Sequence, residues 1–75
     1  MKITARMLEA VRKHREDTGK WPTSVSIGHA ELKELSDHFG YVPATVTFGY
    51  VISQMVSVYI RLADTPTELV CSING

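Results

Sequence analysis

Residues 17–25, DTGKWPTSV, contain a Gly-Lys pair of the kind found in phosphate-binding loops. Such a loop needs a glycine, four further residues, and then Gly-Lys followed by Ser or Thr. Here His14 stands at the first glycine position and Trp21 at the hydroxyl position. The stretch also follows a helical pattern, whereas phosphate is bound where a strand leads into a helix N-terminus. We interpret Gly19 as a helix stop, Trp21 as an aromatic cover for the core and Pro22 as the start of a strand.

The histidine and cysteine side chains do not form a catalytic or metal-binding pattern. His29 and His38 are nine residues apart, so on one helix they would point in opposite directions. His14 falls on the apolar side of a helical pattern, which is typical of a hydrogen-bonded core histidine. Cys71 is the only cysteine, and it alternates with apolar residues as a small buried side chain does. The sequence therefore predicts no enzyme activity, no metal and no cofactor.

Basic residues are concentrated in residues 1–20, which hold six Lys or Arg against three Asp or Glu. Such asymmetry can indicate contact with nucleic acid, and Lys2, Arg6 and Lys13 are the candidate phosphate contacts. Against this function, the net charge is zero and acidic side chains share the exposed face of the first helix. The helical patterns are also too far apart for a helix-turn-helix. Nucleic-acid binding is therefore the alternative function, and we do not favour it.

Two stretches have helical patterns, and a short strand pattern lies between them. Residues 4–18 predict a helix with Thr4 as its N-cap, and residues 30–39 predict a second helix. The buried face of the first helix should contain Ile3, Met7, Leu8, Val11 and His14. In the second helix, Leu32, Leu35 and Phe39 form an apolar stripe, while Glu31, Glu34 and Asp37 form a solvated face. Residues 23–27 alternate polar and apolar side chains, as a half-buried strand does.

No Lys, Arg, Asp or Glu occurs between His38 and Ile60, and three structures compete for this region. A membrane helix would be long enough, but Pro43 and several polar residues interrupt the run. A buried helix would also place apolar residues at helical spacing. We favour two strands within residues 44–62, because β-branched and aromatic residues alternate with other side chains there. A turn at 63–67 then leads to a last strand at 68–73, where Leu69, Cys71 and Ile73 alternate with Glu68, Val70 and Ser72.

These patterns predict a single α+β domain over residues 1–75, with two helices packed on a small, mainly antiparallel sheet in the order α-β-α-β-β-β. A core of this size contributes only about 3–5 kcal/mol, so self-association or another partner is an option from the start. No secretory signal is visible, and a single cysteine fits a reducing cytoplasm. No small-molecule substrate is evident.

The predicted hairpin has a second face that is nearly free of charge. A sheet face exposed to water normally carries charge, so an uncharged one with Met and Tyr indicates a contact surface. The alternative is that the helices straddle the sheet and bury both faces. The candidate interface residues are Thr45, Thr47, Val51, Met55, Ser57 and Tyr59.

Residues 21–35, WPTSVSIGHAELKEL, resemble a pattern in small phage and prophage proteins, in which a Pro-Thr strand leads into a short helix with a Glu-Leu pair. The resemblance implies a bacterial or phage origin, a host cytoplasm and an accessory or structural role, and it assigns no functional residue. The function we expect is protein interaction or self-assembly, with a homodimer as one form and no contact with a membrane.

Overall fold

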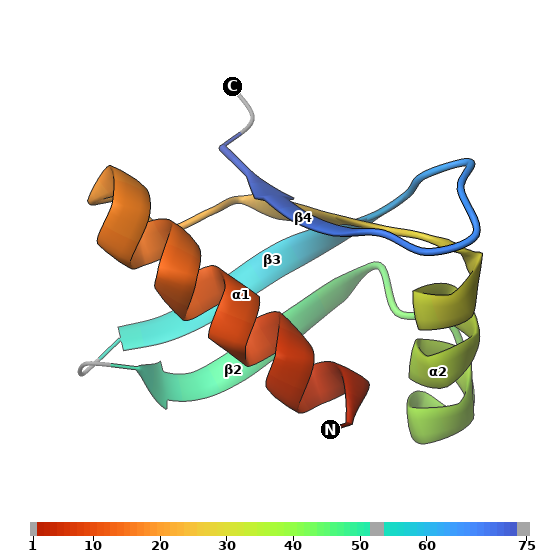
Figure 1. Ribbon diagram of the computed structural model, residues 1–75. Coiled ribbons are helices and arrows are strands. Elements are labelled where there is room, and N and C mark those ends of the chain that lie inside the picture. The colour runs from red at the N-terminus through yellow and green to blue at the C-terminus, as the bar shows by residue number, and fades with distance from the viewer. Residues whose placement is uncertain (1, 52–53, 74–75) are drawn as a thin grey trace.

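Figure 1 shows two helices packed against a four-stranded sheet in a computed structural model that describes residues 2–51 and 54–73. The predicted α+β class and the order α-β-α-β-β-β are confirmed. Both helical interpretations of the uncharged region are wrong, because residues 45–51 and 54–60 form strands. The elements are α1 (Ile3–Thr18), β1 (Ser24–Ile27), α2 (His29–Phe39), β2 (Thr45–Val51), β3 (Gln54–Leu62) and β4 (Leu69–Ser72).

The strands lie in the order β2-β3-β1-β4. The pairs β2–β3 and β1–β4 are antiparallel, while β1 and β3 are parallel, with Val25 opposite Ile60. Consecutive strands tend to be neighbours, but β1 lies between β3 and β4. The segment 63–68 therefore passes the end of β1, where the Ala63 N–H donates to the Ile27 carbonyl at 2.8 Å.

α1 begins one residue earlier than its sequence pattern predicts. The extended N-cap residue is Lys2, so Thr4 lies inside the helix and its predicted role as N-cap is wrong. The helix begins at Ile3 because that side chain is buried in the core. Gly19 ends the helix as predicted, with a φ of 77° and an N–H that donates to the Arg15 carbonyl at 2.8 Å.

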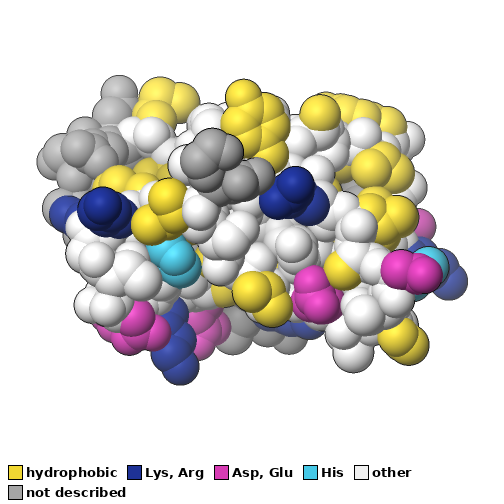
Figure 2. Space-filling model, turned by 90° about the horizontal axis from the view of Figure 1, so that it is seen from above, with side chains coloured by type: hydrophobic (Ala, Val, Ile, Leu, Met, Phe, Trp, Pro, Cys, Tyr) yellow, Lys and Arg dark blue, Asp and Glu magenta, His cyan; other side chains and the backbone are white. Residues whose placement is uncertain are grey.

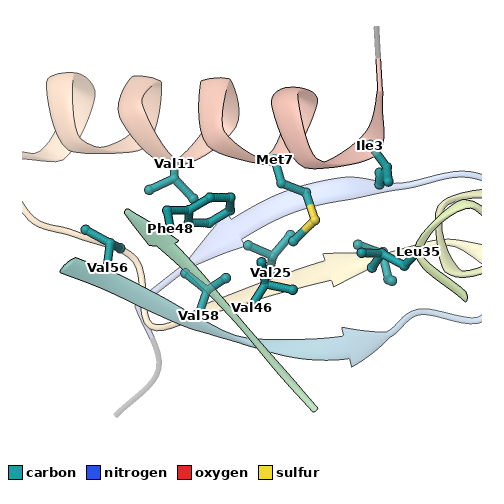
Figure 3. Packing of buried hydrophobic residues seen from close by; sticks show 10 residues of the cluster. Ile3, Met7, Val11, Val25, Leu35, Val46, Phe48, Val56 and Val58 are labelled. Atoms are coloured by element: carbon teal, nitrogen blue, oxygen red, sulfur yellow. The ribbon is translucent and has the colours of Figure 1, made fainter. Parts of the chain in front are cut away.

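The core lies between α1 and one face of the sheet. Figure 3 shows Met7 and Val11 pointing from α1 toward Phe48 and Val25 on the strands. The spacing of Ile3, Met7 and Val11 is one helical turn, so a single stripe of α1 covers the sheet. The buried hydrophobic side chains are Ile3, Met7, Val11, Val25, Ile27, Leu35, Val46, Phe48, Val56 and Val58.

α2 packs at one end of the sheet and contributes Leu35 to the same core (Figures 1 and 3). Leu32 is only partly buried and Phe39 is exposed, so the predicted stripe of α2 is narrower than expected. The helices do not straddle the sheet, because every second side chain of β2 and β3 is exposed wherever their side chains are described. The face of the sheet away from α1 is therefore uncovered over β2 and β3.

Candidate interaction surface

The side of the sheet away from α1 forms a surface that we call the open face. Its side chains alternate with those of the core, because successive residues of a strand point to opposite faces. Strand pairing aligns Thr45, Tyr59, Ser24 and Ser72 in one row across all four strands. The described side chains of the open face are Ser24, Ser26, Thr45, Thr47, Met55, Ser57, Tyr59, Arg61, Val70 and Ser72.

Large apolar side chains are exposed on the open face. Met55 is 63% exposed, Tyr59 64% and Val70 53%. Seen from above in Figure 2, hydrophobic side chains lie along the upper margin and also at separate points elsewhere on the view, while Asp and Glu lie toward the lower side and the right. Other large apolar side chains, among them Tyr41, Val42 and Leu62, are exposed elsewhere on the molecule. Met55, Tyr59 and Val70 differ from these in sharing one face of the sheet, and exposed apolar groups that share one face indicate an interaction site.

The structure brings the predicted interface residues together. Thr45, Thr47, Met55, Ser57 and Tyr59 are all exposed and lie on two adjacent strands. The side chain of Val51 lies outside the described part of the structure. The sequence prediction missed the contribution of β1 and β4, notably Val70, because it did not place β1 next to β3. The alternation of residues 68–73 was the available signal.

The hydroxyl groups of the open face pair with each other across strands. The Thr47 and Ser57 hydroxyls are 2.8 Å apart, and those of Ser24 and Ser72 are 2.9 Å apart. Cross-strand pairs of this kind stabilise a sheet. They differ from a catalytic arrangement, in which a general base activates one hydroxyl as a nucleophile.

Of the three candidate phosphate contacts, Arg6 already forms ion pairs within the protein. Its guanidinium lies 3.3 Å from Glu31 and 3.3 Å from Glu34. Lys13 is exposed, and Lys2 lines a shallow groove together with Glu34, Asp37 and other residues. Carboxylates therefore accompany two of these three basic side chains, and they oppose the approach of a phosphate.

Glu31 is buried, which corrects the prediction that it belongs to a solvated face. Its side chain is only 2% exposed, and it accepts hydrogen bonds from Gly28 N–H at 3.2 Å, Glu68 N–H at 2.8 Å and the Thr67 hydroxyl. Burial alone would raise the pKa of Glu31. The hydrogen bonds from Thr67 and Glu68 and the Arg6 guanidinium outweigh burial and lower the pKa to about 2.

The N-terminus of α2 is covered by another segment of the chain, residues 63–68. The N–H groups of His29 and Ala30 donate to the carbonyl oxygens of Thr65 at 2.9 Å and Pro66 at 3.0 Å. These are the first N–H groups of the helix, which have no acceptor within it. The segment 63–68 therefore occupies the position where a helix could bind an anion.

The stretch that contains Gly-Lys has a structural role. Trp21 is partly buried against the core, and the Arg15 guanidinium lies 5.5 Å from the centre of its ring. A ring nitrogen of His14 lies 3.1 Å from the Lys20 carbonyl oxygen. These contacts tie the end of α1 to the start of β1, and the adjoining helix end repels phosphate.

The remaining histidines and the cysteine do not assemble into a site. His29 lies 3.4 Å from Asp64 at the surface, and the ring of His38 packs against Phe39. Burial raises the pKa of the Cys71 thiol, which favours its protonated form. Within residues 2–51 and 54–73, no three potential metal ligands come together.

The fold and this surface define a two-layer α+β domain with an uncovered sheet face. Searches of protein-family models, of curated proteins and of solved structures each gave no match to this chain. No helix in the described part of the chain is long and apolar enough to span a membrane.

Proposed function

We propose that this protein acts by binding another protein chain through the open face, and that it catalyses no reaction. The observation that carries the proposal is the exposure of Met55, Tyr59 and Val70 on a face whose described side chains include no Asp or Glu. Protein interfaces are enriched in Tyr, Met and Arg and depleted in Lys, Glu and Asp. A sheet face that meets only water carries polar side chains instead.

We further propose an accessory or structural role in the cytoplasm of a bacterial host, in a phage or prophage setting. The resemblance of residues 21–35 to phage proteins supports this origin. The lone thiol of Cys71 supports a reducing compartment, since secreted domains of this size usually depend on disulfides.

Nucleic-acid binding through α1 has less support. Arg6 is held by two carboxylates, so binding a phosphate there would require breaking ion pairs to Glu31 and Glu34. Reversing the charge of Arg6 would also disturb the buried Glu31, so a resulting loss of binding would not identify a phosphate contact. Lys13 is the better test position, because it is exposed.

The test is site-specific photo-crosslinking in a bacterial host. A photoreactive amino acid replaces Tyr59, and the control replaces Tyr41, which is 62% exposed against 64% for Tyr59 but lies in the connection between α2 and β2. We expect a protein adduct from position 59 and none from position 41. The proposal fails if neither position gives an adduct, or if both give the same ones.

A further inference from the structure

We propose, building on the interaction function above, that the partner is a second copy of this chain whose open face stacks on the first. The two sheets are related by a two-fold axis that runs parallel to the strands and passes between β3 and β1. Each protomer then places β3 over β1 of the second copy, and β2 over β4. The result is an aligned sandwich of two four-stranded sheets.

The charge of the open face permits contact between identical copies. A two-fold interface brings the same patch against itself, so any charge on it meets a like charge. Arg61 is the only charged residue among the described side chains of the face, and the whole chain has zero formal net charge. A partner of opposite charge has little to recognise on such a face, whereas a second copy meets little repulsion.

The shape of the open face is complementary to itself about this axis. Strand pairing places the exposed Tyr59 of β3 directly beside the smaller Ser24 of β1. The same register places Arg61 beside Ser26. Rotation about an axis between the two strands therefore sets each large side chain over a small one of the second copy.

The residues at the two ends of the central row of the open face also match those of the second copy. The central row runs Thr45, Tyr59, Ser24, Ser72 across the sheet. The rotation places Thr45 over Ser72 of the second copy, so a hydroxyl that can donate or accept meets another of the same kind. No position of this row leaves a charge facing an apolar side chain.

The size of the face suits a stable dimer. The two longest extents of the molecule are 29 and 23 Å. The whole molecule therefore has a projected area on the order of 600 Å², which limits what one face can contribute and is comparable to the ~800 Å² that each partner contributes to a standard interface. A chain whose own core is small gains additional apolar burial from such a contact.

The first experiment measures the dissociation constant of the dimer by sedimentation velocity from micromolar to millimolar concentration. We expect wild type to dimerise, Tyr59→Glu to weaken the dimer at least about tenfold, and the equally exposed control Tyr41→Glu to change it by less than about twofold. A wild-type chain that stays monomeric throughout, or equal effects of the two variants, overturns the inference.

The second experiment tests the arrangement. Ser24→Tyr places a large side chain against Tyr59 of the second copy, and Tyr59→Ser leaves a hollow, so each variant alone should be largely monomeric. Mixed together, they should form a one-to-one heterodimer, because each contact again joins a large residue to a small one. Absence of the heterodimer from folded variants, judged by circular dichroism, contradicts the arrangement.

These results are separable from those for the general interaction function. An adduct of photoreactive position 59 with a different protein, combined with a monomeric wild type, overturns self-association and leaves the interaction function in place. Absence of any adduct overturns both.

Discussion

Glu31 is the buried side chain of α2 that accepts hydrogen bonds from Thr67 and Glu68 of the segment 63–68. Its pKa falls from 4.5 to about 2 on folding, so between these values the unfolded chain binds more protons. The carboxylate therefore stabilises the fold fully above about pH 4.5, and this contribution decreases as the pH falls toward 2. By linkage a shift of this size corresponds to on the order of 3 kcal/mol.

Replacing Glu31 with Gln should lower the free energy of unfolding by about 2–4 kcal/mol at pH 7, because it leaves Arg6 and buried N–H groups poorly paired. Urea unfolding at pH 7 and pH 3 checks this, and the gap between wild type and variant should narrow at pH 3. Glu34→Gln is the matched control. It also pairs with Arg6 but is 44% exposed, so it should cost less than about 1 kcal/mol. Equal costs for the two variants would contradict the role of Glu31.

The burial of Glu31 had a partial signal in the sequence. It stands three residues after Gly28, the position at which a glutamate reaches back to the N-cap N–H, and four residues before the buried Leu35. What the sequence could not show is that Thr67 and Glu68 lie beside it, because that contact joins positions more than thirty residues apart. The sequence prediction therefore placed the Glu31 side chain in solvent, because it used only the charge of the residue.

At the scale of elements, the close approach of segment 63–68 to the start of α2 depends on Gly28. A Cβ at this position would lie 2.5 Å from the Thr67 Cα. Because this is a backbone atom, no side-chain rotation can relieve the clash. Gly28→Ala should therefore push the segment away and lower the free energy of unfolding by about 1–3 kcal/mol. Limited proteolysis should cut the variant faster within residues 63–68.

Gly40→Ala provides the comparison for this prediction. Gly40 has a φ of 80°, and a Cβ added there would meet no atom within 4 Å, so alanine costs only about 1–2 kcal/mol of backbone strain. This variant should not increase cleavage within residues 63–68. If both alanine variants expose this segment equally, the close packing at Gly28 is not what holds it.

Periodicity together with the β-branched and aromatic content of residues 44–62 was sufficient to predict each helix and strand, but not the order of the strands. The alternation in β2 and β3 separates Val46 and Val58 from Thr45 and Tyr59 correctly, because burial on one face imposes that pattern. The place of β1 between β3 and β4 depends on pairing between residues far apart in the chain, which no local pattern encodes. For this reason Val70 was missing from the predicted surface.

At the scale of the whole molecule, the two candidate functions differ in their response to salt. Contacts to nucleic-acid phosphates release counterions, so such binding weakens steeply as salt rises. Arg61 is the only charge among the described side chains of the open face, so stacking of two faces depends on apolar burial, which salt does not screen. We expect the dimer dissociation constant to change by less than about threefold between roughly 50 and 500 mM NaCl.

Sedimentation velocity across this salt range checks the expectation, with fluorescence anisotropy of single- and double-stranded DNA probes measured in parallel. Lys13→Glu is the informative variant, because Lys13 is exposed on α1, away from the open face. It should leave the dimer unchanged. A dimer that dissociates with rising salt, or DNA binding that Lys13→Glu abolishes, would show that the basic face of α1 rather than the uncharged sheet makes the contact.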